Sequence, residues 1–268
     1  MTAELSIATA PRRRLADDLR AAIAHGEVEL RFQPQVAMTS NRITGVEVLA
    51  RWQHPALGEL GAARLFAAAA RAALLPRLSR HIQAAALTEV AAWPAALAHL
   101  TVALNVTASD LARPGFAREL LVATGRRGIA PERVTVEITE HEPIADLACA
   151  AAVLTTLRAA GMKVALDDYG CGYSGEAWLA ALPLDYIKLD GAEASAMQGS
   201  ESERTRVTAV IAAGLERGLG VIAEGVESEA HRALLAAAGA THYQGYLCAG
   251  PLDRAALAML VERNRCAH

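Results

Sequence analysis

Two adjacent aspartates, Asp167 and Asp168, constrain this chain more than any other feature of its sequence. They follow the apolar run from Val164 to Leu166 and lead into a loop with glycines at positions 170 and 172. Because side chains alternate along a strand, neighbouring aspartates converge on one point only where the strand gives way to a turn. Two carboxylates held together repel each other, so either one stays protonated or a cation lies between them. The run therefore indicates a metal site, and the alternative is a solvated acidic turn.

Other predicted strands carry polar residues at or near their ends in the same way. Carboxylate or amide side chains occur on the segments 43–52, 100–106, 134–138 and 220–225, and a lysine lies on the apolar segment 185–190: Glu47, Asn105, Glu137, Glu224 and Lys188. A single buried glutamate on a strand is more often an ion-pair partner than a metal ligand. Together, however, these side chains supply many oxygen ligands, with little cationic compensation beyond Arg51 and Lys188. Such a set suits a hard cation such as Mg²⁺ or Mn²⁺.

The order of the predicted elements indicates the fold class. Strands and helices alternate along the chain, about eight of each, which predicts an α/β protein with a parallel sheet and favours a closed TIM-type (β/α)8 barrel. The length of 268 residues suits one such barrel, which typically has about 250 residues. Active sites of these barrels lie at the carboxyl ends of the strands, which is where the polar residues occur.

Turn signals divide the chain further. Residues 1–13 are predicted to be a flexible tail, and residues 14–268 a single domain without an internal linker. The first helix is predicted over Leu15–His25, because the apolar spacing is helical and Gly26 follows. The first strand is predicted over Val28–Phe32, closed by the pair Gln33-Pro34.

Composition excludes several classes of function. Three Phe, five Tyr and three Trp are too few for the stacking platforms that bind single-stranded nucleic acid. The net charge of −3 creates no field that attracts a nucleic-acid polymer. The four cysteines show no zinc-site spacing. No secretory apolar segment follows the arginines at 12–14, and no apolar run reaches the length of about 18 residues that a membrane span needs. We therefore expect a soluble, cytoplasmic protein without a membrane partner.

Eight short motifs share their order and spacing with a known family. They are Gln33-Pro34, Glu47-Val48-Leu49-Ala50-Arg51, Leu104-Asn105-Val106, Glu137-Ile138-Thr139-Glu140, Asp167-Asp168-Tyr169-Gly170, the run from Pro183 to Asp190, the run from Ala223 to Glu227, and Gln244-Gly245-Tyr246. The pattern resembles the EAL domain, the bacterial cyclic di-GMP phosphodiesterase family, over about residues 16–260. The resemblance implies a barrel variant whose first strand runs antiparallel to its neighbour. It also implies hydrolysis of cyclic di-GMP to linear 5′-pGpG with two divalent cations, Mg²⁺ or Mn²⁺.

The same resemblance implies roles for individual residues. One cation would be held by Glu47, Asn105, Glu137 and Asp167, and the second by Asp167 and Asp168, with Glu224 and Gln244 nearby through water. Lys188 resembles the residue that contacts or activates the attacking water, as a base or as an electrostatic clamp, and joins Glu47 and Glu224 as the predicted catalytic set. The implied contacts to the dinucleotide are Gln33, Arg51, Gln244, Glu227 and Tyr246. Glu140 resembles a glutamate that steadies the loop after Asp168.

The chemistry of Arg51 leaves two interpretations open. Its planar guanidinium can donate two hydrogen bonds to a phosphate, which suits substrate binding. Arg51 and Glu47 lie two positions apart and share one strand face, so the alternative is an ion pair between them.

Two features depart from the family pattern. Val48 stands where the family has alanine, a small change that we expect to be tolerated. The loop after Asp168 contains Cys171 in place of another small residue, and Gly175 and Glu176 where serine and leucine are usual. Because each added glycine increases backbone freedom, we expect a weak second metal site.

Two classes of function remain open. The first is an active phosphodiesterase, and the second is a catalytically silent cyclic di-GMP receptor that acts as a binding module. Silent members of the family usually lack a metal ligand or the lysine, whereas every such position is filled here. The sequence therefore favours the enzyme. A second copy of the chain and a sensory or regulatory protein are further candidate partners.

Overall fold

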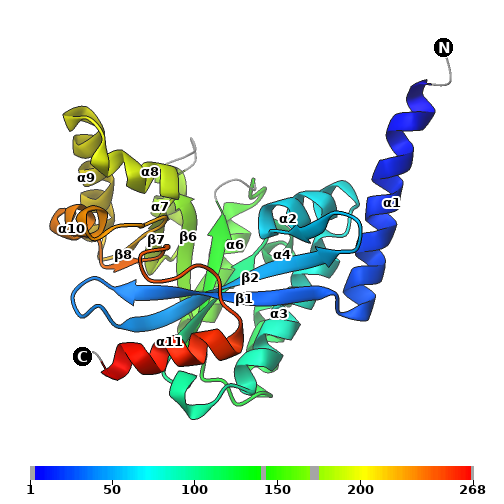
Figure 1. The fold of residues 1–268 in the computed structure, drawn as a ribbon, viewed down its shortest axis with the longest axis horizontal. Coiled ribbons are helices and arrows are strands. Elements are labelled where there is room, and N and C mark those ends of the chain that lie inside the picture. Colours follow the sequence, from blue (N-terminus) through cyan, green and yellow to red (C-terminus); the bar gives the residue numbers. More distant parts are fainter. Residues whose placement is uncertain (1–3, 140–142, 170–174, 267–268) are drawn as a thin grey trace.

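The computed structural model shows a closed barrel, and it describes residues 4–139, 143–169 and 175–266 (Figure 1). In this part of the chain eight strands form the ring: β1 (Val28–Ala37), β2 (Ile43–His54), β4 (Thr101–Val106), β5 (Val134–Thr139), β6 (Lys163–Tyr169), β7 (Tyr186–Leu189), β8 (Gly220–Ala223) and β9 (His242–Tyr243). Neighbouring strands from β2 round to β9 run parallel, whereas β1 runs antiparallel to both β2 and β9 and closes the ring. The short β3 (Gly58–Leu60) pairs with the end of β2. The predicted TIM-type barrel and its antiparallel first strand are confirmed.

Helices surround the ring of strands. The described α-helices are α1 (Glu4–His25), α2 (Ala62–Arg71), α3 (Leu75–Ala91), α4 (Ala108–Leu111), α5 (Phe116–Gly125), α6 (Leu147–Ala159), α7 (Gly175–Ala181), α8 (Gly191–Ser195), α9 (Glu201–Glu216), α10 (Glu229–Ala238) and α11 (Arg254–Cys266). Short 3-10 helices cover Ala95–Leu97, Pro131–Arg133 and Ala196–Gln198. Figure 1 shows α11 running beneath β1 and β2, with α9 and α10 at the opposite side of the barrel from α1. None of the helices in the described ranges has the length and apolar character that crossing a membrane requires.

The first helix is longer than the sequence predicts. α1 begins at Glu4 rather than Leu15, so an irregular backbone over the predicted tail is wrong for the described residues. Pro11 lies inside α1, because a helix can retain an interior proline at the cost of a backbone hydrogen bond. Leu19 and Ala22 anchor the second half of α1, because both are fully buried in a small cluster shared with α2 and α3. The flexibility of the tail and the domain boundary at residue 14 stay predictions.

The first strand also extends further than expected. β1 continues through Pro34 to Ala37, so its predicted end at Gln33-Pro34 is wrong. Phe32 exchanges backbone hydrogen bonds with Leu252, and Val36 pairs with β9 on the same side of β1. Because alternate residues direct their backbone groups to the same side, Pro34 faces the gap between these two partners. A proline is tolerated there, since no ladder hydrogen bond requires its missing N–H.

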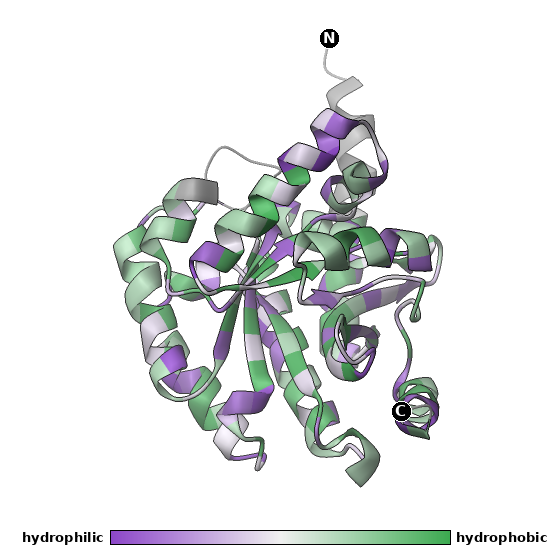
Figure 2. Ribbon diagram, turned by 90° about the vertical axis from the view of Figure 1, so that its left-hand side faces the viewer, coloured by the Kyte–Doolittle hydropathy of each residue, from purple (hydrophilic) through white to green (hydrophobic). Residues whose placement is uncertain are grey.

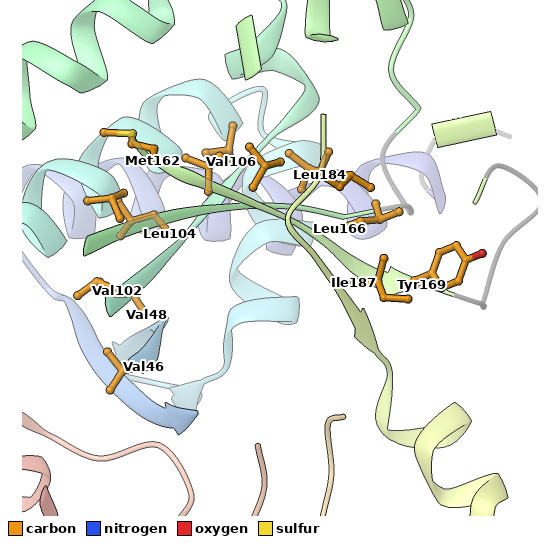
Figure 3. Close-up of a cluster of buried hydrophobic side chains, with 14 of the residues drawn as sticks. Val46, Val48, Val102, Leu104, Val106, Met162, Leu166, Tyr169, Leu184 and Ile187 are labelled. Carbon is orange, nitrogen blue, oxygen red and sulfur yellow. The ribbon is translucent and has the colours of Figure 1, made fainter. Parts of the chain in front are cut away.

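Side chains alternate between the two faces of the barrel wall. Figure 3 shows the outer face, where residues such as Val46, Leu104 and Ile187 form a buried apolar cluster. Burying each such side chain stabilises the fold by about 1.5–3 kcal/mol. The intervening residues of the same strands, such as Glu47 and Lys188, therefore point into the barrel. Figure 2 shows the result as hydrophobic strands interrupted by hydrophilic positions. A shift of one residue would exchange the two faces, so the apolar set fixes the register of the polar one.

Candidate metal centre

Lys188 lies at the centre of an acidic cluster inside the barrel, where β7 places it with 0% exposure. Its Nζ is 2.7 Å from Oε1 of Glu224 and 2.8 Å from Oδ1 of Asp167. The same nitrogen is 3.2 Å from Oε2 of Glu137 and 3.4 Å from Oε2 of Glu47. These carboxylates come from β2, β5, β6 and the end of β8, so the structure brings together residues that are far apart in the sequence.

The carboxylates form two groups that share one member. Glu47, Glu137 and Asp167 make the first group, and Asp167, Asp168 and Glu224 make the second. Within each group one oxygen from every residue lies within 4.8 Å of the others. Asp167 is therefore positioned to contribute to two adjacent cation sites.

Amide side chains hold Glu47 from both sides. Gln244 donates from Nε2 to Oε2 of Glu47 at 2.6 Å, and the same nitrogen lies 3.2 Å from Oε1 of Gln33. Asn105 donates from Nδ2 to Oε1 of Glu47 at 3.3 Å. The structure thus places Gln33, Asn105 and Gln244 beside the carboxylates.

Burial and mutual repulsion perturb the acids of the cluster. Burial raises the pKa of Glu137 well above its usual range, and the neighbouring carboxylates raise it further, although Lys188 opposes the shift. Burial likewise raises the pKa of Glu224 to about 8, despite the attraction of Lys188.

Lys188 shows the reverse balance. Burial works to lower the pKa of the ammonium, but the attraction of the four surrounding carboxylates outweighs it, so the pKa lies well above the ordinary lysine value. Without cations in the cluster, Lys188 is therefore a proton donor rather than a base.

The donor set fits hard divalent cations. Four carboxylates, from Glu47, Glu137, Asp167 and Glu224, surround the buried ammonium of Lys188, and Asp168 adds a fifth acidic group next to Asp167, so acidic groups outnumber the ammonium in the described cluster. Oε1 of Gln244 is a buried amide oxygen that accepts no hydrogen bond from the described residues. Oxygen donors of these types are the ligands that Mg²⁺ and Mn²⁺ prefer.

Asp168 occupies an unusual backbone conformation at the end of β6. Its φ of 57° lies in the left-handed region, which residues other than glycine rarely adopt. Oγ1 of Thr139 donates to Oδ2 of Asp168 at 3.3 Å and so connects the ends of β5 and β6. The turn directs Asp168 to the same point as Asp167, as the pair of adjacent aspartates predicts. Glu140, the predicted brace, lies outside the described residues, as do residues 170–174 of the loop.

The remaining predicted substrate contacts are Arg51, Glu227 and Tyr246. Nε of Arg51 is 3.8 Å from Oε1 of Glu59 on β3, whereas Glu47 is paired with Lys188. The alternative interpretation of Arg51 as the ion-pair partner of Glu47 is therefore not what the structure shows. Glu227 is exposed, and Tyr246 has 72% of its side chain exposed. The structure does not bring either of them into the carboxylate cluster.

Gln35 is a further interior residue that was not predicted from the sequence. Gln35 is buried, and its Nε2 lies 3.4 Å from Oε1 of Glu137 across the barrel. It shares a strand face with Gln33 at a spacing of two. That period would have identified it, had the first strand not been predicted to end at Pro34.

Comparison with known proteins identifies the family of this chain. The model of the EAL domain family matches residues 16–251. The chain belongs to the EAL domain family. This EAL domain is 36% identical over 221 residues to a Pseudomonas aeruginosa protein named Cyclic di-GMP phosphodiesterase PA2567, across 82% of this chain and 38% of that protein. The chain therefore spans about two fifths of the length of that relative.

Solved structures share the architecture of this EAL domain. The EAL enzyme Bd1971, in its form with cAMP and cyclic-di-GMP bound, superposes with a TM-score of 0.88 at 23% identity, covering 95% of this chain and 70% of that one. At that identity the likeness concerns the fold alone. A PaMucR phosphodiesterase in complex with c-di-GMP gives a TM-score of 0.84 at 28% identity, covering 91% and 99% of the two chains.

Proposed function

We propose that this EAL domain is a phosphodiesterase that hydrolyses cyclic di-GMP to linear 5′-pGpG with two divalent cations, Mg²⁺ or Mn²⁺. The observation that carries the proposal is the pair of carboxylate groups that share Asp167 at the carboxyl ends of the parallel strands. Active sites of such barrels lie at that end. Relatives named cyclic di-GMP phosphodiesterases and the c-di-GMP complex of PaMucR add support for the substrate.

The carboxylate groups define which residues would hold the cations. Glu47, Asn105, Glu137 and Asp167 would hold one, and Asp167 and Asp168 the other, with Glu224 and Gln244 nearby. When bound, two such cations neutralise charge on phosphate oxygens and acidify a nearby water.

During hydrolysis, Lys188 would supply positive charge and Glu224 would transfer a proton. Lys188 has no exposed surface and is held by four carboxylates, so it would act as a positioned positive charge towards the phosphate. Glu224, whose Oε1 lies 2.7 Å from Nζ of Lys188, would be placed to exchange a proton as a general base or acid. Glu47 is fixed by two amides and by Lys188, so it serves to orient its neighbours.

Residues next to the carboxylate cluster and accessible residues would bind the dinucleotide. Arg51, with 16% of its side chain exposed, would leave Glu59 for a phosphate, because a guanidinium fork binds two oxygens at once. Gln33 and Gln244 contact each other next to the cluster and would bind polar groups of the substrate. Tyr246 and Glu227 are further candidates, since both are accessible.

The test is incubation with cyclic di-GMP and Mn²⁺, followed by chromatography for pGpG. We expect pGpG to accumulate with the wild-type protein and not with Asp167→Ala. Asp17→Asn serves as the control, because it removes an exposed carboxylate on α1 that pairs with Arg20 at the surface, and it should keep turnover. Binding of cyclic di-GMP without any pGpG would reject the enzyme and leave the receptor function.

A further inference from the structure

A buried polar network lies directly behind the strand end that carries Asn105. It consists of Ser79 and Gln83 on α3 and of Thr107 and Asp110 at the start of α4. Their exposed fractions are 1%, 6%, 4% and 1% in that order, so the network is shielded from water. None of the four side chains belongs to the carboxylate groups of the metal centre. Buried polar side chains of this kind are costly unless they are hydrogen-bonded, so the network requires an explanation.

One carboxylate oxygen of Asp110 accepts hydrogen bonds from most of the donors in the network. Oδ2 accepts from Oγ of Ser79 at 2.5 Å, from Oγ1 of Thr107 at 2.8 Å and from the backbone N of Thr107 at 3.1 Å. Nε2 of Gln83 lies 3.3 Å from the same oxygen. The backbone N of Asp110 donates back to Oγ1 of Thr107 at 3.1 Å, which completes a reciprocal cap of α4.

Gln83 connects this network to the backbone of Asn105. Its Nε2 lies 3.4 Å from the carbonyl oxygen of Asn105 and 3.0 Å from Oγ of Ser79. The network therefore holds the chain just after the Asn105 side chain at two points, the carbonyl of Asn105 and the N–H of Thr107. The side chain of Asn105 lies on the opposite side of this contact and donates to Glu47.

Fixing these two backbone groups restricts the direction of the Asn105 side chain. A side chain at a strand end can swing with its backbone, and Asn105 is supported on one side only, because β5 pairs with it whereas the pairing of β4 with β2 ends at Ala103. The neighbouring ligand Glu137 needs no such support, since it lies inside β5 with strands on both sides. Outer residues that orient ligands commonly change metal affinity about 10- to 100-fold when removed.

We propose that Gln83, together with Ser79 and Asp110, is a positioning residue for Asn105 and sets the affinity of the first cation site. The proposal rests on the proposed function only in taking Asn105 as a ligand. It concerns cation binding by the free protein and not the turnover of substrate.

The test is titration of the metal-free protein with Mn²⁺ alone, followed by the electron paramagnetic resonance signal of free Mn²⁺. Gln83→Met keeps the volume of the side chain but removes its donor, and we expect the affinity of the tighter site to fall about tenfold. Asp110→Asn keeps the shape and should weaken the same site, and Ser79→Ala provides a third variant if either protein fails to fold. The matched control is Thr124→Val, which removes an equally buried hydroxyl on α5, bonded to the carbonyl of Leu120, and should leave Mn²⁺ affinity unchanged.

A double substitution separates positioning from a general loss of structure. If Gln83 acts through Asn105, then adding Gln83→Met to Asn105→Ala should cause no further loss of Mn²⁺ affinity, because non-additivity reports coupling. A loss of the same size in both backgrounds, or an unchanged affinity in folded Gln83→Met, would overturn the inference. So would a wild-type protein that binds no Mn²⁺. A wild-type protein that binds Mn²⁺ without hydrolysing cyclic di-GMP would reject the proposed function and leave this inference intact.

Discussion

The ammonium of Lys188 lies 2.8 Å from Oδ1 of Asp167, the carboxylate that belongs to both acidic groups. A divalent cation held by Asp167 would therefore compete with Lys188 for the same oxygen. In the protein without metal, Lys188 supplies the positive charge that keeps the buried carboxylates together. Cations held by these carboxylates would take over part of this neutralisation and leave the charge of Lys188 to face the substrate phosphate.

Replacing Lys188 by methionine tests this exchange of charges. Lys188→Met should lower the thermal midpoint of the metal-free protein strongly, because breaking a buried ion pair costs about 3–5 kcal/mol. Mn²⁺ should then raise the midpoint more in the variant than in the wild type. Differential scanning fluorimetry with and without Mn²⁺ measures both effects. Lys163→Met is the control, since that lysine is exposed and pairs only at the surface with Asp185. Equal metal-induced shifts in the wild type and Lys188→Met would contradict the idea.

Arg51 offers a test of substrate recognition. Arg51→Lys keeps the charge but loses the two-pronged hydrogen bond, so KM for cyclic di-GMP should rise about tenfold, or about 1.4 kcal/mol. The value of kcat should change little, because the cation ligands are intact. Steady-state kinetics give both quantities, with Arg31→Lys on β1 as the control, since Arg31 pairs with Glu29 at the surface. A fall in kcat without a change in KM would show that Arg51 does not bind the ground state.

The pH dependence of the free energy of unfolding should show how much the ionised side chain of Asp185 stabilises the fold. Burial works to raise its pKa, but hydrogen bonds from Arg158, the backbone of Val164 and Lys163 outweigh it, so its pKa is lower than the usual 3.8. A lowered pKa stabilises the fold at pH values above 3.8, and this contribution is lost as the pH falls through the folded-state pKa. Asp185→Asn should therefore lower the free energy of unfolding at neutral pH, and the difference should shrink in acid. Urea unfolding across pH measures it, and a difference that persists unchanged below the folded-state pKa would count against the ion pairs.

The loop after Asp168 supports a prediction from sequence alone. Gly175 and Glu176 replace a serine and a leucine of the family pattern, and because the structure places both at the start of α7, the glycine makes the junction between loop and helix costlier to order. We expect activity to keep rising with metal concentration and to favour Mn²⁺. The double substitution Gly175→Ser and Glu176→Leu should lower the metal requirement. Saturation of the native protein at low Mg²⁺, with no effect of the double substitution, would show that the loop is already well held.

Most of the barrel and of the carboxylate cluster could be predicted from the sequence. Apolar residues at every second position fix the register of β4 and β5, and this register carries Asn105 and Glu137 into the interior. The adjacent aspartates indicated directly that the side chains of Asp167 and Asp168 converge on one point. These are local sequence patterns, and such patterns predict the structure correctly where burial of the apolar residues favours the same conformation.

The parts that could not be predicted depend on tertiary contacts. β1 passes through Pro34 because the barrel leaves a gap at that point, which no local rule records. The network of Gln83 and Asp110 joins residues 27 positions apart, and each alone looks like an ordinary polar helix residue. The raised pKa of Lys188 likewise arises only when four strands bring their carboxylates together.

The number of Mn²⁺ ions bound per chain tests the central claim most directly. Equilibrium dialysis of the metal-free protein against Mn²⁺, in the presence of a non-hydrolysable analogue of cyclic di-GMP, counts the sites. Because Asp167 belongs to both carboxylate groups, we predict two ions per chain in the wild type and a loss of both sites in Asp167→Ala, whereas Asp168→Ala should lose only one. A wild-type protein that binds a single ion, or an Asp167→Ala variant that retains two, would contradict the shared two-cation site.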